Sequence, residues 1–209
     1  MAPDKVALTG NPLRSELIKI DRQAALNFLK FKEGKFNLLI VGGSQGSHKI
    51  NTVSYLALAS LPQKQDLQVI HISGRRDFTT LNASYATSSI TYKLYDFFCE
   101  MQYAYSLADL VICRAGATTI AELQKFNLPA LLIPYPFADA HQLANAQVLE
   151  NIGAAELMLD LELNVDKLKE RVQAYLYNHE KLEKMQKAYQ KLPVLDAAAR
   201  LALEVLSLK

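Results

Sequence analysis

Three loops carry the residues whose types and spacing point to chemistry. The first reads GGSQGS at residues 42–47, between an apolar run and a helical pattern. Glycines let a backbone approach a ligand closely, and the N–H groups at a helix N-terminus attract anions. The loop lacks the Gly-Lys-Ser/Thr of a Walker A motif, and Val41 interrupts a full GxGxxG pattern. It is therefore either a pyrophosphate-binding loop or a tight turn that packs a helix on a strand.

The second loop reads RAGATT at residues 114–119 and again opens a helical pattern after an apolar run. Thr119 and Glu122 have the spacing of a capping box, in which the two side chains satisfy backbone amides at a helix start. The alternative is that Glu122 accepts hydrogen bonds from a ribose diol, as acidic residues do in nucleotide-binding folds. Spacing alone favours the cap.

The third loop reads PYPFADAHQ at residues 134–142 and is long for a connection from a strand to a helix. Asp139 and Gln142 have the spacing of another capping box. A lone histidine in a first helical turn, such as His141, is typical of a solvated surface. Gln142 and Asn145 share one helix face, where their amides bind either sugar hydroxyls or water.

Together the three loops indicate a negatively charged, hydroxyl-rich ligand such as a nucleotide or a nucleotide-sugar. No Asp-x-Asp pair stands out to hold a metal ion. Cys99 and Cys113 are too few for a disulfide framework, and no Cys/His cluster has zinc spacing. We therefore expect no metal and no cofactor.

Short apolar runs alternate with helical patterns along the sequence, and this alternation predicts the strands and helices that position the three loops. Unbroken runs such as NLLIV suit parallel strands that are covered on both faces. Strands are expected at residues 5–8, 36–41, 67–73, 90–95, 110–113, 130–133 and 155–159. Helices are expected at residues 48–61, 101–108, 119–126 and 142–151. Apolar stripes follow at 165–176 and 182–189, and a last helix rich in alanine and leucine is expected at 195–206. This order predicts a doubly wound α/β domain with a helical tail, and such sheets bind ligands at the carboxyl ends of their strands.

Composition excludes several classes of protein. Half of the 209 residues are hydrophobic and 21% are charged, as in a soluble globular chain. The net charge of +2 gives no reason to expect nucleic acid as a partner. No apolar stretch approaches the roughly 20 residues that span a bilayer, and the first residues contain no signal-peptide core. The expected compartment is the cytoplasm.

Four motifs resemble the signatures of one family, in the family's order. They are TGNPLR at residues 9–14, GGSQGSHKIN at 42–51, CRAGATTIAEL at 113–123 and PALLIPYPFADAHQLANA at 129–146. They resemble the MurG family, the bacterial N-acetylglucosaminyltransferases that make lipid II for peptidoglycan. The resemblance covers nearly the whole chain and only the C-terminal half of that two-domain GT-B fold. It implies a hinge segment at residues 1–14, a Rossmann-like domain that binds the UDP-sugar donor at 15–160, and helices packed on it at 161–209.

The resemblance also implies which residues contact UDP-N-acetylglucosamine. Ser44 and its glycine loop would face the diphosphate, the backbone of Phe98 would recognise uracil, and Glu122 would bind the ribose hydroxyls. Gln142, with His141 beside it, would reach the hydroxyls of N-acetylglucosamine. The full set is Arg14, Gly43, Ser44, Phe98, Ala117, Thr118, Glu122, His141 and Gln142.

The implied reaction moves N-acetylglucosamine from UDP to the C4 hydroxyl of the muramoyl unit of lipid I, with inversion. The acceptor site and the base belong to the family's first domain, so no catalytic residue is expected in this chain. The chain alone is expected to bind the donor weakly and to transfer nothing. In the longer enzyme the expected location is peripheral, on the cytoplasmic face of the inner membrane. The chain departs from the family at Asn127, where glycine is common, and at Phe98, where smaller aliphatic residues are usual.

Two other classes of function stay open. The chain is alternatively a non-catalytic subunit that pairs with a separate polypeptide carrying the acceptor domain. It is alternatively another GT-B enzyme that uses UDP-sugars, such as an epimerase, which would need catalytic acids within the crevice of the sheet. A nicotinamide dehydrogenase is disfavoured because the GxGxxG fingerprint is incomplete.

Overall fold

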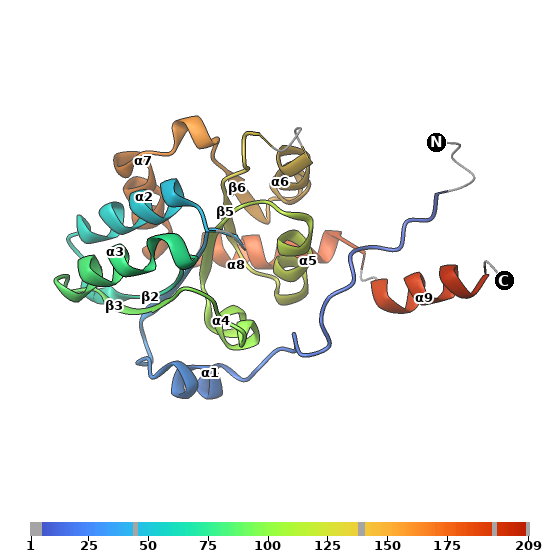
Figure 1. Ribbon diagram of the computed structural model, residues 1–209, viewed down its shortest axis with the longest axis horizontal. Helices are drawn as coiled ribbons and strands as arrows, with labels where there is room; N and C mark the ends of the chain where they lie inside the picture. Colours follow the sequence, from blue (N-terminus) through green and yellow to red (C-terminus); the bar gives the residue numbers. More distant parts are fainter. Residues whose placement is uncertain (1–5, 44–45, 138–140, 194–195, 208–209) are drawn as a thin grey trace.

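A six-stranded parallel sheet forms the centre of the molecule (Figure 1). The computed structural model describes residues 6–43, 46–137, 141–193 and 196–207. The strand order is β3-β2-β1-β4-β5-β6. The strands are β1 (Phe36–Val41), β2 (Leu67–Ile72), β3 (Thr91–Tyr95), β4 (Leu110–Cys113), β5 (Ala130–Leu132) and β6 (Ala155–Leu157).

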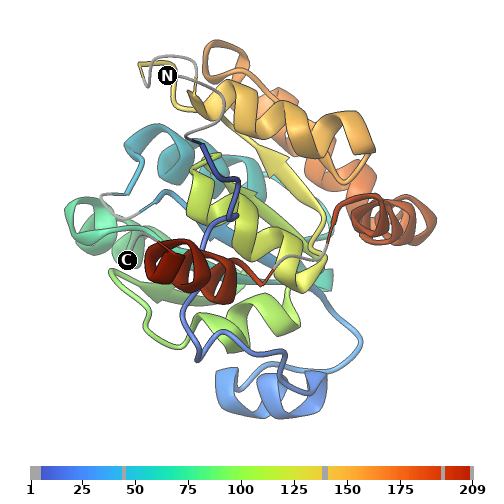
Figure 2. The same cartoon turned by 90° about the vertical axis from the view of Figure 1, so that its right-hand side faces the viewer.

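Helices cover both faces of this sheet (Figures 1 and 2). One face carries α1 (Arg22–Leu29), α4 (Met101–Leu107), α5 (Ala117–Phe126) and α6 (His141–Ile152). The other face carries α2 (His48–Ala59), α3 (Arg75–Ala86), α7 (Val165–Leu176) and α8 (His179–Ala188). The predicted doubly wound α/β fold is therefore confirmed.

Strand alternation divides the core into two layers. In β1, Leu39 packs into the layer of α1, α4 and α5, whereas Leu38 and Ile40 pack into the layer of α2, α3 and α7. All three side chains are fully buried. This is why the strand reads as an unbroken apolar run, and why the run predicted a strand covered on both faces.

Three elements differ from the sequence prediction. Residues 6–8 form no strand, and Val6 and Leu8 are exposed. The prediction also missed α1 and α3. In α3 only Asp77, Leu81 and Tyr85 are buried, so most of its sequence is polar and its apolar stripe is too thin to detect. Helix α1 carries a clearer signal, because the Asp21 side chain accepts hydrogen bonds from the first turn.

The C-terminal helices do not all pack on the domain. Helices α7 and α8 contribute side chains to the core, and the Tyr189 hydroxyl after α8 donates to the Leu128 carbonyl at 2.7 Å. The last helix, α9 (Ala197–Ser207), buries only Ala197 and stands away from the body in Figure 1. The expected packing of the whole tail is therefore wrong for α9. Among the described helices, none combines the length and apolarity required to cross a membrane.

The strand order places a topological switch point between β1 and β4. The chain leaves β1 toward one face of the sheet and leaves β4 toward the other, so the loops after these two strands diverge. Open α/β sheets bind ligands in the crevice that results at the carboxyl ends. The loops at residues 42–47 and 114–119 both begin there.

Candidate functional site

A cleft of about 820 Å³ lies at the switch point. The loops after β1, β4 and β5 all contribute to it, together with the segment after β6. The sequence predicted these first three loops as one site, and the fold places them side by side. The lining residues are Gly42, Gly43, Gly46, Ser47, His48, Lys49, Arg114, Gly116, Thr118, Thr119, Tyr135, Pro136, Phe137, Gln142 and Asp160.

The glycines of the first loop differ in the space that their surroundings leave for a side chain. A Cβ atom on Gly42 would lie 2.4 Å from the Ser47 amide nitrogen, and one on Gly46 would lie 2.3 Å from the Ser73 carbonyl oxygen. Both glycines are therefore required by the turn itself. Gly43 has a φ of +93° and no atom within 4 Å of where its Cβ would stand, so it faces open space in the cleft. Ser44 lies outside the described residues.

Helix α2 starts at this loop and points its N-terminus at the cleft. Ser47 is the N-cap, and its hydroxyl accepts from the Ile50 amide at 3.5 Å. Residues 48 and 49, the first of the helix, line the cleft. Amides at such a terminus, with the partial positive charge of the helix, bind anions.

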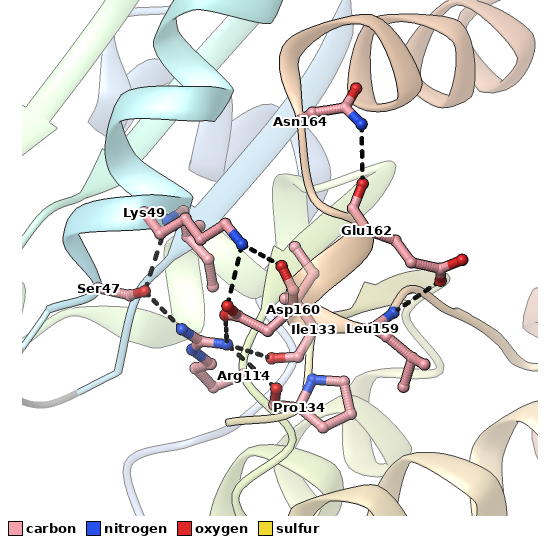
Figure 3. A network of polar contacts seen from close by, with 10 residues as sticks. Ser47, Lys49, Arg114, Ile133, Pro134, Leu159, Asp160, Glu162 and Asn164 are labelled. Atoms are coloured by element: carbon pink, nitrogen blue, oxygen red, sulfur yellow. Dashed lines mark hydrogen bonds and ion pairs between the residues drawn. The ribbon is translucent and has the colours of Figure 1, made fainter. Parts of the chain in front are cut away.

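Arg114 ties the loops of the cleft together (Figure 3). One guanidinium nitrogen donates to the carbonyl oxygens of Ile133 and Pro134, at 3.1 and 3.2 Å, and to an oxygen of the Asp160 carboxylate at 2.6 Å. The other donates to the Ser47 hydroxyl at 2.9 Å. The side chains of Arg114 and Asp160 are only 12% and 13% exposed. Both partners are largely removed from water. The ion pair and these hydrogen bonds together fix the relative positions of the segments that follow β1, β4, β5 and β6.

Lys49 completes the cluster from the first turn of α2. Its ammonium group lies 3.1 Å from the Asp160 carboxylate and also donates to the Asp160 carbonyl. Burial opposes the charged form of Asp160. The hydrogen bonds and charges of Arg114 and Lys49 outweigh it and hold the pKa of Asp160 below its usual value. The described lining thus sets two cationic side chains against one carboxylate, and the surplus favours an anionic ligand.

Gln142 and Asn145 hold the second loop. The side-chain oxygen of Gln142 accepts from the Tyr135 and Ala115 amides at 2.9 and 3.2 Å, and the Asn145 amide donates to the Ala115 carbonyl at 3.0 Å. The predicted proximity of these two amides on α6 is confirmed. Their partners are backbone groups, at Ala115 in the second loop and at Tyr135 in the third. The Asp139 half of the predicted cap lies outside the described residues.

The predicted cap by Thr119 and Glu122 is wrong. Helix α5 begins at Ala117 with Gly116 as its N-cap, so both residues lie inside the helix. Glu122 instead accepts a hydrogen bond of 2.8 Å from the Tyr105 hydroxyl. Burial raises the pKa of Glu122 above its usual value, against the opposing effects of the Tyr105 hydrogen bond and the Arg14 charge. Glu122 is therefore not committed to a cap, and its carboxylate stands near a cationic side chain.

The other predicted residues fall into two groups. Gly43, Thr118 and Gln142 line the cleft, and Thr118 accepts a hydrogen bond from Asn11 at 3.2 Å. The remaining described residues do not line it, and they are Arg14, Phe98, Ala117, Glu122 and His141. Of these, Phe98 is buried against Tyr95, with ring centroids 4.4 Å apart.

The sequence prediction missed the charged cluster. Arg114 stands in a recognised motif, but nothing in the sequence links it to Asp160, which lies 46 residues further along the chain. Lys49 lies in the motif at residues 42–51 and in the expected first helical turn, but neither feature links it to Asp160. Within the described residues, no three metal-ligating side chains of His, Cys, Asp or Glu gather at one point.

Comparison with known proteins agrees with this geometry. Residues 37–201 match the family described as the glycosyltransferase family 28 C-terminal domain. A relative from Desulforamulus reducens is 37% identical over 90% of this chain and 53% of its own length. Its name is UDP-N-acetylglucosamine–N-acetylmuramyl-(pentapeptide) pyrophosphoryl-undecaprenol N-acetylglucosamine transferase. A relative of the same name from Coxiella burnetii is 36% identical over 94% of this chain and 54% of its own. The chain thus spans about half the length of the curated relatives it matches.

Solved structures give the same result. The crystal structure of MurG from Acinetobacter baumannii superposes with a TM-score of 0.74 at 32% identity, covering 83% of this chain and 52% of that one. WaaG, a glycosyltransferase of lipopolysaccharide biosynthesis, gives 0.67 at 17% identity over 96% of this chain. At that identity the second likeness concerns the fold alone. The sheet and its helices thus correspond to about half of the MurG chain from Acinetobacter baumannii.

Proposed function

The chain belongs to the glycosyltransferase family 28 C-terminal domains, and on that premise we propose that it binds UDP-N-acetylglucosamine as the sugar donor. The reaction it serves is transfer of N-acetylglucosamine to lipid I, which yields lipid II for peptidoglycan. The observation that carries the proposal is the cleft at the switch point, with its glycine loop, helix N-terminus and surplus of cations. The names of the relatives supply the sugar and the acceptor.

The diphosphate of the donor belongs at the first loop. There the amides at the start of α2 can donate to phosphate oxygens, beside Gly43 and Lys49. The same groups stabilise the charge that develops on UDP as it leaves. A helix N-terminus contributes about 0.3–1 kcal/mol to such an interaction, and up to about 2 kcal/mol when partly buried. That is small against a whole barrier, so positioning of donor and acceptor must supply much of the rest.

The nucleoside belongs beside α5. Glu122, held by Tyr105 and close to the Arg14 charge, would accept hydrogen bonds from the ribose hydroxyls. The loop before α5, with Ala117 and Thr118, would border the phosphates and the sugar. Phe98 would present its backbone to uracil, while Gln142 and the neighbouring His141 would reach the N-acetylglucosamine hydroxyls.

The acceptor belongs to the half of the relatives that this chain does not span. We assign lipid I binding and the catalytic base to that half. The longer enzyme would then work at the cytoplasmic face of the membrane, where its lipid-linked acceptor lies. The chain by itself would bind the donor without transferring the sugar.

Calorimetric titration of the chain with UDP-N-acetylglucosamine tests the proposal. UDP-glucose and ADP serve as controls for the sugar and the base. We expect binding that requires uridine. Equal affinity for ADP, or no binding to any of the three, would contradict a uridine-specific donor site.

A variant of Glu122 tests the ribose contact. Glu122→Gln keeps the size of the side chain but removes the carboxylate. We expect it to bind UDP about tenfold more weakly than the parent and to lose discrimination against 2′-deoxy-UDP, because a charged acceptor strengthens a hydroxyl hydrogen bond. The parent's affinity for 2′-deoxy-UDP is the matched control. Undiminished discrimination in the variant would remove Glu122 from the ribose site.

A further inference from the structure

A series of hydrogen-bonded polar side chains connects the interior of the sheet to the cleft. It begins at Tyr85 on α3 and passes through His71 on β2 and Asn51 on α2. It continues to Asp77 on α3 and ends at His48, the first residue of α2. Tyr85, His71 and Asn51 have no exposed surface, whereas the His48 side chain is 61% exposed and belongs to the cleft lining.

Tyr85, His71 and Asn51 each donate in the direction of Asp77, and His48 donates to Asp77 from the other side. The Asn51 amide nitrogen lies 2.8 Å from the Ser73 carbonyl and 2.7 Å from the Asp77 carboxylate, and both of those groups only accept. The Asn51 oxygen therefore faces the Nε2 atom of His71 at 3.0 Å, and that nitrogen must carry the proton. The Nδ1 atom of His71 is left to accept from the Tyr85 hydroxyl at 3.0 Å.

The buried surroundings of His71 favour the neutral form of its imidazole. Complete burial lowers its pKa to about 3, although the nearby Asp77 charge opposes this shift. Asp77 is ionised by contrast. Burial works against its charge, but hydrogen bonds from Asn51 and His48 and the charges of His48 and Arg76 hold its pKa below the usual value. Asp77 therefore accepts at both carboxylate oxygens, from Asn51 at one and from His48 at the other.

This arrangement fixes the imidazole of His48. Its Nδ1 atom lies 2.9 Å from an Asp77 oxygen and donates to it. The ring is therefore held at the N-terminus of α2, and its Nε2 atom makes no hydrogen bond within the described part of the chain. A carboxylate that accepts from one ring nitrogen fixes the orientation of the imidazole and the direction in which its other nitrogen faces.

We propose that His48 is a ligand of the donor diphosphate, and that Asp77 and Asn51 are residues that position it. The inference rests on the proposed donor-binding function and adds a side-chain contact to the helix amides. The protonated Nε2 would donate to a phosphate oxygen at the glycine loop. Lys49 and Arg114 both contact Asp160, whereas His48 contacts Asp77 through Nδ1 and leaves Nε2 without a hydrogen-bond partner among the described residues.

The test compares His48→Asn with the parent by calorimetry, using UDP and uridine as probes. Asparagine keeps a donor where Nδ1 stands, so the contact with Asp77 survives while Nε2 is lost. His179→Asn is the matched control, because His179 is likewise the exposed first residue of a helix, far from the cleft. We expect the affinity of His48→Asn for UDP to fall about five- to tenfold, as for one charge-assisted hydrogen bond. The affinity for uridine should not change, and the control should bind like the parent.

Asp77→Asn is the second variant, checked for folding by its melting temperature. We expect it to weaken UDP binding by a smaller factor, and to add nothing in the double variant with His48→Asn, because both act through one imidazole. Unchanged UDP affinity in His48→Asn, or an equal loss for uridine, would overturn the inference and leave the donor site standing. A parent chain that binds no UDP would overturn the proposed function and the inference with it.

Discussion

The two ends of the sheet carry cavities of similar size but different character. At the carboxyl ends lies the cleft of about 820 Å³, and at the amino ends lies a cavity of about 610 Å³ beside α7 and α8. Both contain cations and carboxylates. At the amino end, however, Arg22 and Asp109 form a pair whose side chains are 49% and 23% exposed. The cleft's pair, Arg114 with Asp160, is 12% and 13% exposed. Volume and charge are therefore common to both ends, and what distinguishes the end with the proposed donor site is a desolvated ion pair beneath diverging loops.

Replacing the arginine of each ion pair should give the largest difference in stability between the two ends of the sheet. Arg114→Ala leaves Asp160 buried with Lys49 as its ionic partner and unties the loops. We expect a loss of about 3 kcal/mol in the free energy of unfolding, as for a broken buried pair. Arg22→Ala is the matched control and should cost less than about 1 kcal/mol because its pair is solvated. Urea denaturation measures both, and equal losses would show that burial of the pair does not set its strength.

The glycines offer the next contrast. Gly46 and Gly34 have nearly the same positive φ, +74° and +75°. A Cβ atom on Gly46 would lie 2.3 Å from the Ser73 carbonyl oxygen, whereas one on Gly34 would meet nothing within 4 Å. Gly34→Ala should cost about 1 kcal/mol for its left-handed backbone. Gly46→Ala should cost more than twice that and abolish UDP binding, because the loop must shift. A Gly46→Ala protein with parental stability and affinity would contradict the steric argument.

Acid should destabilise the fold through the buried histidine, His71. Neutral His71 has a pKa of about 3 in the fold, against about 6.5 in an unfolded chain. The unfolded state thus binds the extra proton, and stability is lost as the pH falls from about 6.5 toward about 3. At about pH 5 the free energy of unfolding should change by about 1.4 kcal/mol per pH unit, because at that pH the His71 proton is bound only in the unfolded state.

Urea midpoints at pH 5, 6 and 7 measure this slope. Asp77 and Asp160 have lowered pKa values and act only at more acid pH, while Glu122, whose pKa is raised, works in the opposite direction. A stability that is flat over this range would mean that His71 is not held neutral.

The smallest effect is expected from the last helix, which belongs to neither end of the sheet. Helix α9 buries only Ala197, and Leu203 and Leu206 are 67% and 60% exposed. Deleting residues 197–209 should therefore change the melting temperature by less than about 2 °C, since little apolar area leaves the core. A larger fall would show that α9 stabilises the domain in solution.

Much of the fold could be predicted because its signals are local. Strand β1 lies where its apolar run predicted it, and the other five sheet strands differ from the prediction by at most two residues at an end. Asn127 ends α5 with a φ of 56°, the left-handed position for which asparagine is the next best residue after glycine. The failures also have a local cause. Thr119 and Glu122 have the spacing of a capping box, but the helix begins at Ala117 with Gly116 as its N-cap. The match in spacing is therefore coincidental.

The sequence by itself determined the doubly wound sheet, the three loops at its carboxyl edge and the family to which they belong. Periodicity and glycine placement act over a few residues, so they can be read directly from the chain. Only the tertiary structure decided that Arg114 meets Asp160 and that His48 meets Asp77, pairs that are 46 and 29 residues apart. These contacts exist because parallel strands bring loops that are distant in the sequence to one edge of the sheet, where largely buried carboxylates such as Asp77 and Asp160 require hydrogen-bond donors.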